Sequence, residues 1–223
     1  MTGKTSPKKH RVAVLDDHPM TRDGIGRWIA GEPDMEVCWE ASSAEGGLTA
    51  SLNAPPDLIV ADISLQGKSG LEFIRDVRAA LPALPVLVLS MHDESIYAER
   101  ALRAGARGYI MKHEGGAKLL SAIRSILAGK IHVSERMSGR ILENFSSPSV
   151  HIGVAGLSDR EFEVFELLGA GLSTQKIGKR LSLSPKTVDS HRANIKAKLR
   201  LTKMSELVAF AARWISSEVP AKE

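Results

Sequence analysis

The chain has 223 residues, 43% of them hydrophobic and 25% charged, which is typical of a globular protein large enough for two small domains. No apolar run approaches the roughly 20 residues of a transmembrane helix, and no signal-peptide pattern begins the chain, so we expect no membrane association. The single cysteine, Cys38, excludes an internal disulfide and fits a cytoplasmic location.

Positive charge is concentrated in the last third of the chain. Residues 1–155 hold 18 basic and 18 acidic side chains, whereas residues 156–223 hold 12 and 8. Within residues 173–203, nine basic side chains accompany a single acid, Asp189. A solvated helix face usually mixes both signs, so this local excess favours a polyanion, and nucleic acid in particular, as the partner.

Strand and helix patterns alternate five times after an N-terminal tail, residues 1–10, that we expect to be disordered. Short uninterrupted apolar runs indicate buried strands, and apolar residues three and four apart indicate helices. Such alternation predicts an α/β domain with a doubly wound, five-stranded parallel sheet, of the flavodoxin-like kind. The expected strands are 11–16, 35–40, 57–62, 85–90 and 107–111, and the expected helices are 19–30, 43–53, 70–80, 94–104 and 115–128.

The rest of the chain has helical periodicity. Residues 130–156 read as a linker that contains a helix from Ser134 to about Phe145. A small all-α domain of four helices, residues 157–217, is expected to follow, with a short tail at 218–223. Its first helix opens with a capping box at Ser158 and Glu161. The expected helices are 159–169, 174–181, 185–199 and a last one from Thr202 or Lys203 to about Ile215.

Polar side chains follow four of the predicted strands. Asp16 and Asp17 end the first strand, Asp62 the third and Ser90 the fourth, and Lys112 follows the fifth. The carboxyl ends of parallel strands meet at one edge of the sheet, so these side chains should converge. Any one of the acids alone is more often a helix cap or a solvated loop end, but the combination indicates a single site.

The chemistry of that site follows from the residue types. Mg²⁺ prefers oxygen ligands, and one or two carboxylates are enough to hold it, so Asp16, Asp17 and Asp62 can bind the ion. A carboxylate can also attack phosphorus to form an acyl phosphate. Lys112 would neutralise the charge of the transferred group, and Ser90 could hydrogen-bond its oxygens.

Residues 11–129 resemble the receiver domain of bacterial two-component response regulators. The resemblance rests on the Leu-Asp-Asp-His-Pro stretch at residues 15–19 and on four further positions. These are Asp62, Ser90, Tyr109 and Lys112. One departure is His113, since many receivers have proline after this lysine.

The resemblance implies that a sensor histidine kinase phosphorylates Asp62. It also implies that Mg²⁺ is held by the acidic residues and by the backbone carbonyl of Ser64. On phosphorylation Ser90 would turn toward the phosphoryl group while Tyr109 repacks inward, which makes these two residues a switch biased by the added charge.

Residues 157–217 resemble the LuxR-type helix-turn-helix domain. The matching stretches are residues 157–164, 171–174, 177–178 and 187–191. Within the expected helix 185–199, apolar spacing predicts that Val188, His191, Ile195 and Leu199 face the domain core. The opposite face would enter the major groove, where basic side chains engage phosphates.

The resemblance also implies DNA contacts for individual residues on that face. Asp189, Ser190 and Ala193 stand at base-facing positions, and Lys186 lies on the same face. The implied phosphate contacts are Thr174, Thr187, Arg192 and Lys196.

The two resemblances together describe a NarL/FixJ-type response regulator, which is a transcription factor and not an enzyme. Its implied partners are promoter DNA, a sensor histidine kinase and a second copy of itself, paired on activation or on DNA. The final helix is the implied dimer element, although the same residues could serve only as core. They are Met204, Leu207, Val208, Ala211 and Ile215.

Two alternatives remain open from the residues alone. The first is a DNA-binding regulator that needs no phosphorylation and uses the receiver as a dimerisation module. The second is a magnesium-dependent phosphohydrolase with Asp62 as nucleophile. It is much less favoured, because enzymes of the haloacid-dehalogenase type have a second acid where this chain has Ser64.

Overall fold

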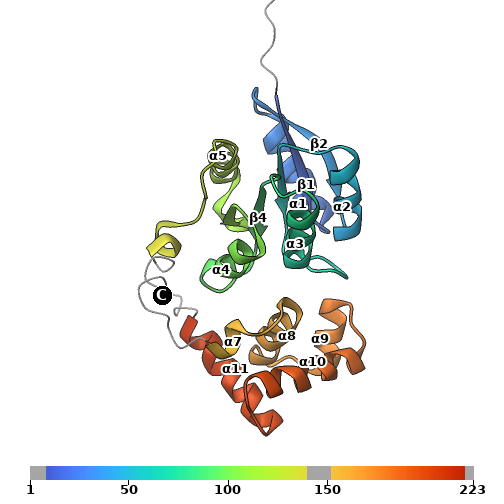
Figure 1. Ribbon diagram of the computed structural model, residues 1–223, viewed down its shortest axis with the longest axis vertical. Coiled ribbons are helices and arrows are strands. Elements are labelled where there is room, and N and C mark those ends of the chain that lie inside the picture. The colour runs from blue at the N-terminus through green and yellow to red at the C-terminus, as the bar shows by residue number, and fades with distance from the viewer. Residues whose placement is uncertain (1–8, 140–151, 219–223) are drawn as a thin grey trace, which may run out of the picture. The chain divides into compact units, whose positions relative to one another are not determined.

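The computed structural model describes residues 9–139 and 152–218 (Figure 1). The chain divides into two compact units, with the boundary after Met137. That boundary lies within the segment 130–156 that the sequence predicts to be a linker.

A five-stranded parallel sheet forms the centre of the N-terminal unit. Its strands are ordered β2-β1-β3-β4-β5, which confirms the doubly wound arrangement expected from the alternating pattern. β3 is buried at every position, as expected for a strand covered on both faces. The strands are β1 His10–Leu15, β2 Met35–Ala41, β3 Leu58–Ala61, β4 Val86–Ser90 and β5 Gly108–Met111.

Helices cover both faces of this sheet (Figure 1). α1 and α5 contact each other on one face, while α2, α3 and α4 contact one another in series on the other. The α1 and α5 face encloses an aliphatic core built around Val12, Val14, Ile29 and Ile123. The helices are α1 Pro19–Ala30, α2 Ala44–Asn53, α3 Gly70–Ala80, α4 Glu94–Ala104 and α5 Gly116–Leu127, with a 3₁₀ turn, η1 Lys112–Glu114, after β5.

Local sequence signals account for the ends of these helices. α3 begins with a capping box in which Ser69 accepts from the Glu72 amide and Glu72 accepts from the Ser69 amide. Asp93 caps α4 by accepting from the Ser95 amide at 2.8 Å. Beyond α5, Gly129 has a φ of 83°, the left-handed conformation that commonly ends a helix. The first two caps fix where α3 and α4 begin, and Gly129 fixes where α5 ends.

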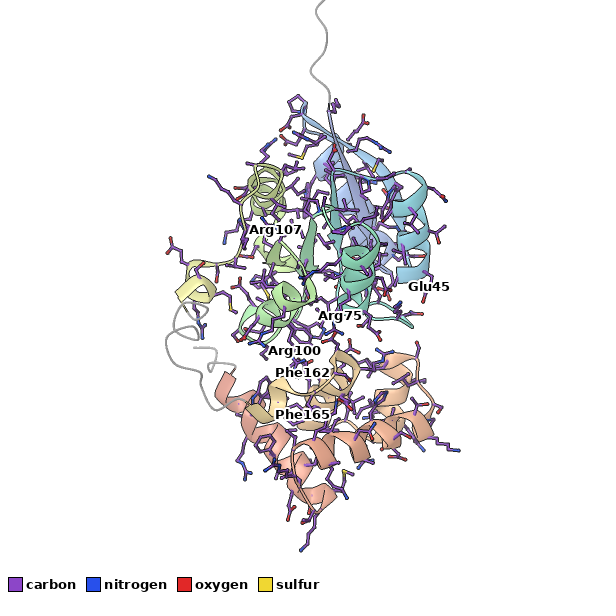
Figure 2. The ribbon with its side chains drawn as sticks, in the orientation of Figure 1. Glu45, Arg75, Arg100, Arg107, Phe162 and Phe165 are labelled. Atoms are coloured by element: carbon purple, nitrogen blue, oxygen red, sulfur yellow. The ribbon has the colours of Figure 1, made fainter. Side chains whose placement is uncertain are left out.

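The C-terminal unit is entirely helical in its described residues. α8 and α11 pack together through aromatic rings, and Figure 2 labels two of them, Phe162 and Phe165, side by side on α8. The ring of Trp214 on α11 lies edge-on to both, with centroid distances of 5.6 and 5.7 Å. The helices are α7 Ile152–Ala155, α8 Asp159–Gly169, α9 Thr174–Leu181, α10 Pro185–Lys198 and α11 Met204–Glu218.

Most predicted elements lie within one or two residues of the observed ones, with three differences. α7 was not predicted, since Gly153 and its neighbours read as linker. The last helix continues to Glu218, three residues beyond the expected end. The expected helix from Ser134 is helical over residues 135–139, and its remainder lies outside the described residues, as do residues 1–8 and 219–223 of the two tails. No described helix is both long and apolar enough to cross a bilayer.

Candidate functional site

The ends of β1, β3 and β5 bring together two carboxylates and one ammonium. Lys112 Nζ lies 2.8 Å from Asp16 Oδ2 and 2.7 Å from Asp62 Oδ2. The side chains of Asp16 and Asp62 are only 1% and 2% exposed, and that of Lys112 is 12% exposed. The two acids therefore share one cation in a nearly water-free setting, where an uncompensated charge is costly.

The pKa values of this cluster reflect that environment. Burial raises the pKa of Asp62 above its ordinary range, and this outweighs the opposing attraction of Lys112. Burial acts to lower the pKa of Lys112, but the Asp62 carboxylate and the hydrogen bond to Asp16 outweigh it, so its pKa is raised. Lys112 is thus held as a cation, while burial still disfavours the ionised form of Asp62, which a second positive charge beside it would stabilise.

Asp17 and His18 extend the acidic cluster at the same edge. Asp16, Asp17, His18 and Asp62 each offer one possible ligand atom, and these atoms all lie within 4.8 Å of one another. His18 Nδ1 lies 2.8 Å from Asp17 Oδ1 and 3.3 Å from Asp16 Oδ1. The predicted metal residues Asp16, Asp17 and Asp62 are therefore adjacent, in an arrangement typical of a Mg²⁺ site.

Ser64 and Gly70 shape the loop that follows β3. The Ser64 amide donates to Asp62 Oδ1 at 3.2 Å, so one oxygen of Asp62 faces this amide and the other faces Lys112. The Gly70 amide donates to the Ile63 carbonyl at 2.9 Å, which closes the loop onto the strand end. A Cβ on Gly70 would lie 2.2 Å from the Asp62 carbonyl oxygen, so this close approach requires glycine.

Ser90 and Tyr109 both form hydrogen bonds with the backbone of His92. The His92 amide donates to Ser90 Oγ at 3.1 Å, and the Tyr109 hydroxyl donates to the His92 carbonyl at 2.7 Å. The His92 ring in turn lies 2.8 Å, Nε2 to Oγ, from the Ser64 hydroxyl and packs against Tyr97 with a centroid distance of 4.4 Å. One residue therefore connects the loop after β3 with both residues of the predicted switch.

His18 and His92 border the site although neither was a predicted site residue. Each stands two residues beyond a predicted site residue, Asp16 and Ser90 respectively, on the loop that leaves the carboxyl end of a strand. That position is the signal that could have identified them, because such loops border the site in parallel sheets.

The helix α10 has the two faces that its sequence predicts. Val188 and Ile195 are fully buried, and His191 and Leu199 are partly buried. The predicted base-facing residues Asp189, Ser190 and Ala193 are exposed, as are Lys186 and Thr187, whereas Thr174, Arg192 and Lys196 are partly buried. All eight predicted DNA-contacting residues thus retain some exposed surface on α9 and α10.

A polar network joins the start of α9 to that face. Arg192 Nη1 donates to Asp189 Oδ1 at 2.9 Å and also to the hydroxyl of Thr174. At the turn between the two helices, a Cβ on Gly178 would lie 2.7 Å from the Leu183 carbonyl oxygen, so the turn can close only over a glycine. The helix pair is therefore fixed by a tight turn at one end and a hydrogen-bond network at the other.

Two protein families match this chain. Residues 12–124 match the family described as "Response regulator receiver domain", and residues 155–211 match "Bacterial regulatory proteins, luxR family". Among curated proteins, the response regulator GacA of Pseudomonas viridiflava is 32% identical over 204 residues, covering 91% of this chain and 95% of its own. The transcriptional regulatory protein DegU of Brevibacillus brevis is 29% identical, covering 93% and 95%.

Solved structures agree with these matches. A LuxR-family two-component response regulator from Aurantimonas sp. is 34% identical, has a TM-score of 0.58, and covers 63% of this chain and 100% of its own. RcsB from Salmonella enterica serovar Typhimurium, solved bound to a promoter in the presence of phosphomimetic BeF₃⁻, has a TM-score of 0.61 and covers 92% and 100%. At 23% identity, RcsB shows the shared fold alone.

Proposed function

The chain belongs to the NarL/FixJ family of response regulators, which join a receiver domain to a LuxR-type DNA-binding domain, and on this basis we propose that phosphorylation of Asp62 controls its binding to promoter DNA. As a two-component response regulator, it regulates transcription and is not an enzyme. The proposal adds which residue is modified, what the modification acts on, and which residues touch DNA.

The contact of Lys112 with Asp62 and Asp16 is the observation that carries this proposal. Asp62 is a buried carboxylate with an ammonium 2.7 Å from one oxygen and a backbone amide 3.2 Å from the other. In the transfer, an Asp62 oxygen attacks the phosphorus of a phosphohistidine on the kinase, a P–O bond forms, the P–N bond breaks, and the electron pair returns to the imidazole. Lys112 and the Ser64 amide stand where they would stabilise charge on the phosphoryl oxygens.

The donor set at this edge fits Mg²⁺. Asp16, Asp17 and Asp62 lie close together, and Lys112 contacts two of them, Asp16 and Asp62. Their carboxylate oxygens are the ligands this ion prefers. We assign these three residues, with the Ser64 carbonyl, as the residues that would hold it. When bound, the ion supplies the positive charge that the excess carboxylates and the incoming phosphoryl group require.

The switch would pass through Ser90 and Tyr109. Ser90 is buried at the end of β4, and moving its hydroxyl toward a phosphoryl group on Asp62 requires it to leave the His92 amide. Tyr109 is buried, and its hydroxyl donates a hydrogen bond to the His92 carbonyl. A displacement of His92 would therefore move the acceptor of Tyr109 as well. The two predicted switch residues are therefore coupled through one intervening residue.

DNA binding is assigned to the exposed face of α10 and the start of α9. An α-helix fits the major groove, and the nine basic side chains within residues 173–203 provide the attraction to phosphates. We assign Asp189, Ser190 and Ala193 to the base edges. The flanking contacts are assigned to Thr174, Lys186, Thr187, Arg192 and Lys196.

Dimerisation on activation or on DNA completes the proposal. In α11, Leu207 and Ala211 are fully buried, whereas Met204, Val208 and Ile215 keep exposed surface and are the part of the helix that could meet a second copy. A two-fold dimer would require operator half-sites spaced to match its symmetry. We place this activity in the cytoplasm, where kinase and chromosome are both accessible.

Intact-mass measurement after incubation with Mg²⁺ and a small acyl phosphate tests the proposal. The wild type should gain one phosphoryl group and then bind promoter DNA more tightly, while Asp62→Asn should do neither. If neither protein gains mass, whether from the acyl phosphate or from a phosphorylated kinase, and both bind DNA equally, the receiver acts as a constitutive dimerisation module instead.

A further inference from the structure

Asp189 is the one acidic side chain among the nine basic ones of residues 173–203, and it lies on the exposed face of the recognition helix α10. Its side chain is 61% exposed. A carboxylate at this position repels the DNA phosphates, but it can also accept a hydrogen bond from a base donor in the major groove, which a basic side chain cannot do. We propose that Asp189 reads a C·G base pair by accepting a hydrogen bond from the cytosine amino group; this rests on the DNA-binding function proposed above.

The hydrogen-bond network fixes the position of the carboxylate. Oδ1 of Asp189 accepts from Arg192 Nη1 at 2.9 Å and from the Thr174 hydroxyl at 3.4 Å. Arg192 is only 20% exposed and also donates to Thr174, which holds it at the junction of α9 and α10. Asp189 is therefore oriented by a contact with Thr174 on α9, the first helix of the pair, before any DNA binds, which lowers the entropy lost on binding.

The same network leaves the other carboxylate oxygen available. Within the described residues, Asp189 Oδ2 forms no hydrogen bond. The Arg192 guanidinium offsets the negative charge, which reduces repulsion from the phosphates on either side of the groove. The result is a neutralised, oriented pair that presents one strong acceptor to the base edges.

Base chemistry selects the partner of this acceptor. In the major groove, cytosine offers only the N4 donor on its own edge, whereas guanine offers two acceptors and thymine one acceptor with a methyl group. A carboxylate is therefore attracted to cytosine and repelled by guanine and thymine. Adenine also has a donor, N6, but its neighbouring N7 is an acceptor and makes a poorer match for a carboxylate.

A competing account makes Asp189 only a positioning residue that orients Arg192 and Thr174 toward phosphates. Removing it would then weaken binding to all sequences alike, since phosphate contacts carry no base information. Base readout predicts a different result, namely a loss of preference confined to one position in each half-site.

Selection of binding sites from random double-stranded DNA by the phosphorylated full-length chain separates these accounts. The wild type should prefer C·G at one position of each half-site, on the order of 10-fold over the other pairs. Asp189→Asn retains an acceptor for Arg192 and should shift that position to A·T, because asparagine pairs with adenine N6 and N7. Asp189→Ala should lose the preference there and keep it elsewhere.

Lys186→Ala serves as the matched control on the same helix face and should weaken binding to all DNA sequences without changing the preferred site. Unchanged preference in both Asp189 variants, or a uniform loss of affinity, would overturn the readout by Asp189. If the wild type enriched no sequence at all, the DNA-binding function itself would fail, and that result is distinguishable because it does not depend on the variants.

Discussion

Replacing Lys112 by methionine should destabilise the N-terminal unit far more than replacing Asp62 by asparagine. Lys112 is the cation that Asp16 and Asp62 share, at 2.8 and 2.7 Å, and both carboxylates are almost fully buried. Its removal leaves two buried, uncompensated negative charges facing each other. Asp62→Asn instead removes one charge and leaves the pair of Lys112 with Asp16 intact.

The magnitude follows from the burial of the three groups. Removing one partner of a buried ion pair costs about 3–5 kcal/mol, and the 12% exposure of Lys112 places this case near 3 kcal/mol. Asp62→Asn should be neutral or stabilising, because burial raises the pKa of Asp62. When folding raises the pKa of an acid, the free energy of unfolding of the protein falls as the pH rises from the acid's ordinary pKa, here 3.8, through the raised value. The wild type should show this loss of stability, and Asp62→Asn should not.

Hydrogen exchange of the full-length chain, read on peptides from β1, β3 and β5 and corrected for intrinsic rates, measures the effect within this unit. Lys112→Met should exchange about 100-fold faster than wild type in those strands, which corresponds to roughly 3 kcal/mol. The double variant should recover part of the loss, because only one buried carboxylate then remains. Equal protection in Lys112→Met and wild type, or equal loss in both single variants, would refute the charge-sharing argument.

Gly70→Ala should lower the free energy of unfolding by about 1–3 kcal/mol and slow phosphoryl acceptance, because the new Cβ would meet the Asp62 carbonyl. Gly24→Ala is the control and should be tolerated, because its Cβ would meet nothing within 4 Å. Equal hydrogen-exchange protection in the two variants would contradict this prediction. Burial alone would raise the pKa of Glu161, but its hydrogen bond from Lys198 lowers it, so its contribution to stability should be present above the ordinary 4.5 and disappear as the pH falls through the lowered value. Exchange of α8 peptides should therefore depend less on acid pH in Glu161→Gln, and an unchanged profile would count against the pair. Lys196→Ala should reduce the slope of log affinity for DNA against log salt by about one without altering the preferred site, and a changed site would rule out a phosphate contact.

The elements and the acidic cluster were predictable because both follow from patterns along the chain. An apolar run such as Leu58–Ala61 has no polar position to expose, so it indicates a strand buried on both faces. Parallel strands then bring their carboxyl ends to one edge, and that topology alone placed Asp16, Asp62 and Lys112 together. α7 was missed because a four-residue segment that contains Gly153 and precedes Gly156 carries too little periodicity to distinguish a short helix from a turn.

The contacts between side chains on different elements were not predictable for a different reason. Thr174, Asp189 and Arg192 are up to 18 positions apart, and their network exists only because the turn over Gly178 sets the crossing of α9 and α10. No repeat or spacing in the sequence reports that crossing. The same holds for the Ser64–His92 contact, which joins two loops 28 positions apart.

Because His92 is hydrogen-bonded to both Ser90 and Tyr109, a movement of the Ser90 hydroxyl affects more than Ser90 itself. Moving the Ser90 hydroxyl toward Asp62 breaks its bond from the His92 amide, at a cost of about 1 kcal/mol unless the backbone follows. If the backbone follows, the His92 carbonyl moves as well, and with it the acceptor of the Tyr109 hydroxyl. The next residue, Asp93, is the N-cap of α4, so the displacement reaches the start of that helix. A phosphoryl group on Asp62 would therefore alter Ser90, Tyr109 and the first turn of α4 as one unit, because all of these contacts belong to two consecutive residues of one loop.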